Sequence, residues 1–553
     1  MEEISGSLKN IRRIFHLLPV KYRKRGIWVA ASVCLRALLN FIGLTALIPL
    51  VTSAVEPEKG SSLPLCLAVF AFIVFKNMVN VWLGGVHIHY INQLYFHFSE
   101  KLYKSYFRKG LLFVKQTPSD SLSNRINGVC YRFSQSIVSQ FFTISGEILL
   151  LLLIWTGLFI YSYQTALWLS ATLFPALWIY LFVIRKKLRL YGQAENEIHW
   201  KQWRLVTETF KGYAEVTLSH AFPLFFKRFK AGLEEITRYR EHSDRIQRLP
   251  ESMMEIYIIG GWIVAALLSK GGNDLKLTLG IIAVATVRML PSVRNLLNGL
   301  VLLKNNAYTI DIVGDALLNE EQEGEPTLSL PFSFRRQIEI RDLTFSFTGA
   351  GAREQAVIRH FNLILHKGER IGIRGASGTG KSTLFNLLLG FYTPQQGEIC
   401  IDGVRLDCQN RSEWHRIAGY VPQDVFILDG TLAENIALGE ESINEERLKQ
   451  ALRQSNLDEF VRSLPEGIHT LAGENGCRLS GGQRQRIGIA RALYKQAEVL
   501  FFDEATSSLD SQTEQEITDA INRLSAGNRQ LTILIISHRE SSLAGCSRVV
   551  DLL

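Results

Sequence analysis

Hydrophobic residues are spread unevenly along the 553-residue chain. Long apolar runs fill the first 305 residues, whereas the last 220 read as a water-soluble α/β domain. A helix needs about 20 apolar residues to cross about 30 Å of hydrocarbon. Six segments meet this requirement, and we predict membrane spans at about 27–55, 63–87, 138–161, 165–185, 252–269 and 276–303. The pattern therefore predicts an α-helical six-span transmembrane domain followed by an α/β domain.

An acidic segment that contains Gly324 and Pro326 and has no apolar period lies between the two halves. Such a composition is typical of a boundary between domains. We predict a transmembrane domain at 1–316, a linker at 317–334 and the α/β domain at 335–553.

The distribution of basic residues predicts the orientation in the membrane. The formal net charge is +9, and Lys and Arg concentrate before the first span and in the loops 88–137 and 186–251. The loops on the opposite side (56–62, 162–164 and 270–275) are short and nearly free of basic residues. By the positive-inside rule, both termini and the α/β domain are cytoplasmic, and the protein is a multi-pass protein of the cytoplasmic (inner) membrane. The bilayer explains the charge, so no nucleic-acid partner is expected.

The cysteines do not indicate a metal site or a disulfide framework. All seven are scattered, odd in number and without metal-ligand spacing, so neither a zinc site nor a disulfide framework is expected.

The two long cytoplasmic loops are rich in helix formers, and loops of this length are rarely structureless. We interpret them as helical extensions of the spans, joined by short turns near 115–124 and 211–222, with ordinary surface loops as the alternative.

The α/β half contains a phosphate-binding loop motif. Residues 375–383 read GASGTGKST and fit G-x-x-x-x-G-K-S/T, between an apolar strand pattern at 370–373 and a helical pattern at 384–389. In this context glycines let backbone N–H groups turn onto phosphates at a helix N-terminus. Lys381 is expected to reach the β- and γ-phosphates, and the Ser382 hydroxyl to ligate Mg²⁺.

Two further segments support this assignment. The apolar strand pattern at 499–502 ends in Asp503 and Glu504. In P-loop enzymes an acid at this place holds Mg²⁺, and the next acid is placed to orient and deprotonate the attacking water. The segment LSGGQ at 479–483 opens a helical pattern and forms a second anion site from backbone N–H groups and the helix dipole. One chain with two phosphate sites and one P-loop suggests that the second site serves the nucleotide of a partner chain.

These motifs resemble those of ABC transporters, and the chain resembles the half-transporters of the type I exporters over essentially its whole length. Residues 375–383 look like the Walker A motif, Gln423 like the Q-loop glutamine and 479–483 like the signature. Residues 502–504 look like Walker B with its catalytic acid, and 508–510 look like the D-loop.

Two single residues extend the resemblance. His538 is similar to the switch histidine, and Phe347 matches the aromatic residue that stacks on adenine, with Phe in place of the usual Tyr. A phenylalanine buried in a strand is the alternative for Phe347.

The resemblance implies ATP and Mg²⁺ as cofactors. It implies catalytic roles for Glu504, His538 and Gln423, and Mg²⁺ ligation by Ser382, Gln423 and Asp503. The nucleotide-binding residues that it implies are Phe347, Gly375, Ala376, Ser377, Gly378, Thr379, Gly380, Lys381, Ser382, Thr383, Gln423, Ser480, Gly481, Gly482, Gln483, Asp510 and His538.

The resemblance also implies an assembly. Two chains pair head to tail, so that each ATP lies between the Walker A motif of one chain and the signature of the other. Since every motif is intact, a homodimer would have two equivalent sites, and a heterodimer is the alternative. The turns near 115–124 and 211–222 correspond to the family's coupling helices.

Fusion of the spans to the ATPase in one chain implies export or flipping rather than import. Through 37–44, 211–216 and 287–292 the transmembrane half is most similar to lipid-linked oligosaccharide flippases. We therefore predict an ATP-hydrolysing translocase that exports or flips an amphipathic, anionic lipid-linked substrate. The alternatives are an exporter of a peptide or small hydrophobic compound, and a membrane ATPase that gates a channel or signalling partner without cargo.

Four cations fall within the cytoplasmic half of the predicted spans, namely Arg36, Lys76, Arg288 and Arg294. None has an acid one helical turn away. A charge inside a membrane usually faces a cavity or a partner. We predict that Arg288, with Arg36 and Arg294, attracts an anionic headgroup such as a phosphate. The alternative is that these side chains snorkel to the cytosolic interface or lie on cytosolic extensions of the helices.

Overall fold

The computed structural model describes residues 18–50, 63–161, 163, 166–167, 198–199, 201–268, 273–320, 333–347, 356–376, 378–505, 511–527 and 530–552. The chain forms two compact units. The helical unit comprises Met1–Lys109 and Gln116–Glu323, and the α/β unit comprises Gly110–Lys115 and Gly324–Leu553. The predicted bounds of the domains and of the spans stay predictions.

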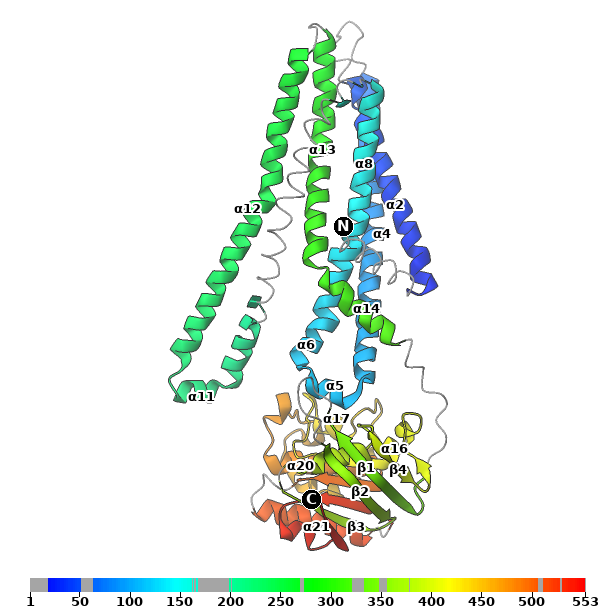
Figure 1. The fold of residues 1–553 in the computed structure, drawn as a ribbon, viewed down its shortest axis with the longest axis vertical. Helices are drawn as coiled ribbons and strands as arrows, with labels where there is room; N and C mark the ends of the chain where they lie inside the picture. Colours follow the sequence, from blue (N-terminus) through cyan, green and yellow to red (C-terminus); the bar gives the residue numbers. More distant parts are fainter. Residues whose placement is uncertain are drawn as a thin grey trace. The chain divides into compact units, whose positions relative to one another are not determined.

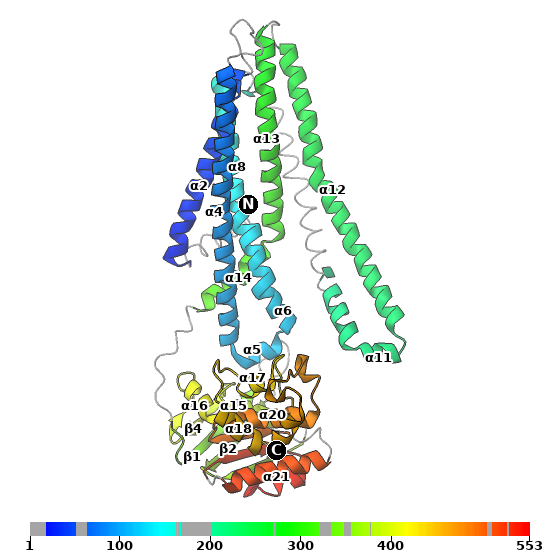
Figure 2. The same cartoon turned by 180° about the vertical axis from the view of Figure 1, so that it is seen from behind.

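Long helices make up the helical unit, and α2, α4, α8 and α13 lie side by side (Figures 1 and 2). The helices are α2 (Val20–Thr45), α4 (Leu63–Arg108), α8 (Ser139–Tyr161), α12 (Phe222–Leu268), α13 (Asn273–Asn305) and α14 (Tyr308–Glu320). The contact between α2, α8 and α13 is apolar, because Ala37, Ile154 and Met289 of these helices belong to one buried cluster. The helices therefore pack as a bundle.

Three of the described helical stretches are long and apolar enough to cross a membrane, namely Val20–Leu50, Leu63–Arg108 and Ser119–Tyr161. The predicted fifth and sixth spans lie in α12 and α13. The predicted fourth span, apart from Ala166 and Leu167, falls outside the described residues.

The described parts of the long loops 88–137 and 186–251 are mostly helical, as the extension interpretation expected. Helix α4 has 46 residues, or about 69 Å at 1.5 Å per residue, which exceeds the hydrocarbon thickness more than twofold. Gly110 follows with a φ of 79°, a conformation that costs glycine little, and the short helix α5 (Gly110–Gln116) makes the turn. The turn thus precedes the predicted 115–124, whose last residues already lie in α6 (Ser119–Ser123). The second turn contains α11 (Tyr213–Leu218), within the predicted 211–222.

Two π-helical segments interrupt the return from this first turn. They are η2 (Asn124–Val129) and η3 (Phe133–Val138), separated by α7 (Cys130–Arg132) and followed by α8. Such i→i+5 turns are rare, and no sequence pattern used above predicts them.

The α/β unit contains two sheets. An antiparallel sheet has the order β2-β1-β4-β5 and a parallel sheet the order β6-β7-β8-β3-β9. The strands are β1 (Gln337–Ser346), β2 (Ala356–His366), β3 (Arg370–Arg374), β4 (Gln396–Ile401), β5 (Val404–Arg405), β6 (Ala418–Val421), β7 (Val499–Asp503), β8 (Thr532–Ile536) and β9 (Arg548–Asp551). Every residue of β7 and β8 is buried, as expected for parallel strands covered on both faces.

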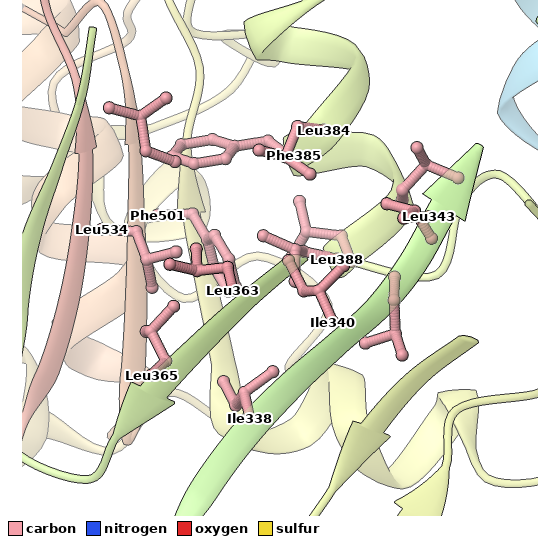
Figure 3. Packing of buried hydrophobic residues seen from close by; sticks show 14 of the residues in the cluster. Ile338, Ile340, Leu343, Leu363, Leu365, Leu384, Phe385, Leu388, Phe501 and Leu534 are labelled. Carbon is pink, nitrogen blue, oxygen red and sulfur yellow. The ribbon is translucent and has the colours of Figure 1, made fainter. Parts of the chain in front are cut away.

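Helices flank these sheets and carry the motifs. They are α15 (Lys381–Leu388), α16 (Arg411–Ile417), α17 (Leu432–Ile436), α18 (Glu445–Gln454), α19 (Asp458–Ser463), α20 (Gly481–Tyr494), α21 (Ser511–Gly527) and α22 (Glu540–Leu543). Figure 3 shows the core between the sheets, where Ile340 of β1 and Phe385 of α15 face Phe501 of β7. This core fixes the end of β3 and the start of α15, the two ends of the phosphate loop.

Candidate functional site

The phosphate loop connects the buried strand β3 to α15. Gly378 and Gly380 have φ values of 86° and 93°, which residues with a side chain rarely adopt. A Cβ atom added to Gly380 would also lie 2.7 Å from Val357 Cγ1. The glycines are therefore needed for the backbone path itself. Ser377 lies outside the described residues.

The side chains of the loop are held in place by its own carbonyls. The Lys381 ammonium is buried and donates to the carbonyl oxygens of Gly375 at 3.0 Å and Ala376 at 2.8 Å. The Thr379 hydroxyl donates to the Ala376 oxygen at 3.0 Å, and Thr383 is half-buried in the first turn of α15. The Lys381 ammonium therefore lies beside the loop backbone that would bind the phosphates.

Asp503 ends β7 and is bonded from two sides. Ser382 Oγ donates to its Oδ1 at 3.1 Å, and the Tyr420 hydroxyl donates to its Oδ2 at 3.2 Å. Burial raises the pKa of Asp503, so this carboxyl holds its proton to a higher pH than an ordinary aspartate does. Burial, with the nearby Asp503 charge, also raises the pKa of Tyr420. A bound cation would favour the charged carboxylate of Asp503, so Ser382 and Asp503 together fit a Mg²⁺ ligand set.

The next residue, Glu504, contacts the predicted switch histidine. Its φ is 49°, an uncommon conformation for a residue with a side chain, and its N–H donates to the Ile536 oxygen at 3.0 Å. Its Oε1 lies 3.1 Å from His538 Nε2, and both side chains are partly accessible. The structure therefore brings two of the three predicted catalytic residues together.

Gln423, the third predicted catalytic residue, follows β6 and is exposed. The pairing of Val421 with Phe502 places it beside the end of β7. Its carbonyl oxygen accepts a hydrogen bond of 2.5 Å from Gln485 Nε2, a buried side chain of α20. Sequence reasoning missed both Gln485 and Tyr420, since neither stands in a motif.

The signature opens α20 with a complete capping box. Gln483 N–H donates to Ser480 Oγ at 3.2 Å, and Ser480 N–H donates to Gln483 Oε1 at 2.8 Å. Ser480 is exposed, Gly481 is partly exposed and Gly482 is buried. The helix packs in a hydrophobic cluster with α17 and α18, whereas α15 packs in the core between the sheets. The helices that follow the signature and the phosphate loop therefore pack in different hydrophobic clusters of the α/β unit.

Phe347 stands at the end of β1 and is 42% exposed. Its ring meets those of Phe345 and Tyr392 edge-on, with centroids 5.1 and 5.9 Å away. The alternative of a phenylalanine buried in a strand is therefore wrong, and part of the Phe347 side chain is accessible. Asp510 lies outside the described residues. No group of three or more His, Cys, Asp or Glu suited to a metal occurs within the described part of the chain.

A second site lies in the helical unit. A cavity of about 200 Å³ is lined by residues of α2, α4, α8 and α13, including Arg36, His87, Glu147, Arg288 and Asn295. The Nε atoms of Arg36 and Arg288 are buried and have no hydrogen-bond partner among the described residues. These two predicted substrate residues therefore line a common cavity between helices.

The other two cations lie elsewhere. Arg294 is exposed and is not among the residues that line the cavity. The stem of Lys76 lies against Gly43 of α2, since a Cβ added there would be 2.7 Å from Lys76 Cδ. Sequence reasoning found no acid one turn from the four cations, but Glu147 of α8 lines the same cavity as Arg36 and Arg288.

Comparison with known proteins identifies the family. Residues 358–507 match the family described as ABC transporter. The ATP-dependent lipid A-core flippase of Syntrophus aciditrophicus (strain SB) is 30% identical over 465 residues, which cover 82% of this chain and 74% of that protein. This chain belongs to the ABC transporter family. The heterocyst differentiation ATP-binding protein HepA of Nostoc sp. is 27% identical over 490 residues, or 85% of this chain and 76% of that one.

A solved structure of a bacterial Atm1-family ABC exporter with ATP bound shares the fold. Its TM-score is 0.74 at 21% identity, and the match covers 96% of this chain and 93% of that one. The predicted fold class, a helical transmembrane domain with an α/β P-loop ATPase domain, is confirmed, and the number of six spans stays a prediction. The protein is an integral membrane ABC exporter half-transporter that binds nucleotide and hydrolyses ATP.

Proposed function

We propose that this ABC exporter works as a homodimer in the cytoplasmic membrane, with both termini in the cytosol, and flips or exports an amphipathic, anionic lipid-linked substrate. The observation that carries the proposal is the cavity between the helices, where the Nε atoms of Arg36 and Arg288 are buried and have no hydrogen-bond partner among the described residues. A membrane charge usually faces a cavity that serves a substrate or a partner. Relatives named lipid A-core flippase support a lipid cargo.

The ATPase step follows from the residues at the ends of β3, β7 and β8. Ser382 and Asp503 would hold Mg²⁺, whose charge helps to neutralise the transferring phosphoryl group. Lys381 and the loop N–H groups bind the phosphates, and Glu504 takes the proton of the attacking water. His538, in contact with Glu504, holds that carboxylate in position. The signature of the partner chain completes each site.

The substrate role of the cavity has a direct test. The Arg288→Ala variant should lose the stimulation of ATP hydrolysis by an anionic lipid, because the guanidinium that attracts the headgroup is gone. Hydrolysis is measured in vesicles of phosphatidylcholine with and without phosphatidylglycerol. We expect the ratio of the two rates to fall to about one in the variant and to exceed two in the wild type.

Arg294→Ala is the matched control, because it removes the same charge six residues away on α13 but outside the cavity. It should keep the wild-type ratio. Full stimulation in an Arg36/Arg288 double alanine would disprove the headgroup role. Stimulation by lipid in vesicles that hold this protein alone also argues against a channel-gating ATPase without cargo.

The adenine contact is the next prediction. Phe347→Ala should raise the KM for ATP about 2- to 12-fold with a smaller effect on kcat, because an aromatic contact of about 0.5–1.5 kcal/mol acts mainly on binding. Phe347→Tyr keeps the ring and should behave as wild type. Steady-state hydrolysis at varied ATP concentration measures both constants, and an unchanged KM in Phe347→Ala would place the adenine elsewhere.

A further inference from the structure

The cavity between α2, α4, α8 and α13 contains an acid that the anionic-headgroup proposal does not use. Glu147 lies on α8, and its Oε1 accepts a hydrogen bond of 2.9 Å from Asn295 Nδ2 of α13. Its Oε2 is buried and has no hydrogen-bond partner within the described part of the chain. Because a carboxylate oxygen can accept about two bonds, this atom has unused acceptor capacity.

Three other buried polar atoms of the lining also have no hydrogen-bond partner in the described part of the chain. His87 is only 9% exposed, and its Nε2 has no partner among the residues that the structure describes. The same holds for the buried Nε atoms of Arg36 and Arg288. Buried polar atoms are nearly always hydrogen-bonded, so four such atoms around one cavity are available to bind a molecule there. The cavity volume of about 200 Å³ exceeds the roughly 150 Å³ of a cavity that binds benzene.

Neutralisation of the arginines alone does not explain Glu147. A carboxylate with that role is expected to pair directly with a guanidinium, often through both of its oxygens. Asn295 instead holds one oxygen, and the other stays without a partner. The cavity therefore offers two cationic hydrogen-bond donors, Arg36 and Arg288, and one separate anionic hydrogen-bond acceptor, Glu147.

We propose that this cavity selects a headgroup in which a phosphate stands beside a hydroxyl or ammonium group. Arg36 and Arg288 bind the phosphate, and Glu147 Oε2 accepts the neighbouring O–H or N–H. A phosphate without such a neighbour meets the unpaired carboxylate and is rejected, so the acid supplies selectivity. The inference deepens the proposed function and rests on it.

The test compares phosphatidylglycerol with phosphatidylmethanol of the same acyl chains. Both carry one negative charge, but only the first has hydroxyl groups beside its phosphate. Native mass spectrometry of the purified full-length protein in detergent, with the two lipids in equal amounts, measures which is retained. We expect the wild type to prefer phosphatidylglycerol about tenfold, which corresponds to 1.4 kcal/mol.

The decisive variant is Glu147→Gln, which keeps the shape and can keep the contact with Asn295. Its amide presents N–H groups to the cavity in place of an acceptor, so the tenfold preference should fall to about one. Ser145→Ala on the same helix is the matched control, because that exposed hydroxyl is bonded to the Phe141 carbonyl oxygen at 2.8 Å. It should keep the preference.

Equal retention of both lipids by the wild type, with both lost in Arg288→Ala, overturns the role of Glu147 and leaves the proposed function standing. A preference that survives in Glu147→Gln has the same meaning. If Arg288→Ala retains both lipids as the wild type does, the proposed function fails and the inference with it. The comparison of the two lipids in the wild type needs no variant. The inference can therefore be tested even if Glu147→Gln folds poorly.

Discussion

Glu504→Gln should bind ATP and hydrolyse it at least about 10²-fold more slowly than the wild type. The amide keeps the size of the side chain but cannot accept the proton of the attacking water, and loss of a general base typically costs a factor of 10² to 10⁴. The position supports the role, because the carboxylate follows the Asp503 that ends β7 and touches His538 at 3.1 Å. Phosphate release by the purified protein measures the rate.

Binding and chemistry separate in a second measurement. Since Glu504→Gln removes only the base, the variant should accumulate an ATP-bound, closed dimer, visible as nucleotide retained through gel filtration. Lys381→Ala should retain no nucleotide, because it removes the ammonium that lies against the phosphate loop. Glu540→Gln makes the same chemical change on an exposed residue two positions beyond His538 and should keep the wild-type rate. A wild-type rate in Glu504→Gln would show that the base lies elsewhere.

The ATPase site could be predicted from the sequence because its chemistry is contiguous there. The phosphate loop, the acids after β7 and the capped signature each occupy a few consecutive residues, and the elements around them follow the expected strand and helix patterns. The contacts that hold these parts together are not local. Tyr420 bonds to Asp503 across 83 positions, and Gln485 bonds to the carbonyl of Gln423 across 62 positions. No pattern in the chain pairs such residues without the fold.

The helical unit shows the same limit. Apolar length predicts helices, but it does not say which faces meet. Asn295 and Glu147 are 148 positions apart, so a search for acids one turn from Arg288 could not find this one. The first turn begins earlier in the chain than predicted, because α4 ends at Arg108 and Gly110, with its positive φ, follows it. The roles of the site residues stay predictions until the variants are measured.

Gly481→Asp should abolish hydrolysis through the partner chain. If the signature of one chain serves the ATP of the other, this change places a carboxylate against a phosphate. The fold should tolerate it, because an acid in the first turn of a helix interacts favourably with the helix dipole and α20 keeps its capping box. Gly481→Asn adds a side chain of the same size without charge and should retain measurable activity.

Mixing Gly481→Asp with Lys381→Ala separates a shared site from a site within one chain. Neither variant should hydrolyse ATP as a homodimer. In the heterodimer, one site joins the intact phosphate loop of the first chain to the intact signature of the second, and the other site carries both defects. Differently tagged chains, purified through both tags, should therefore recover up to about half of the wild-type rate if one site can act alone. A wild type that is active as a strict monomer contradicts this arrangement, because a monomer has no second chain whose signature could complete the site at its phosphate loop.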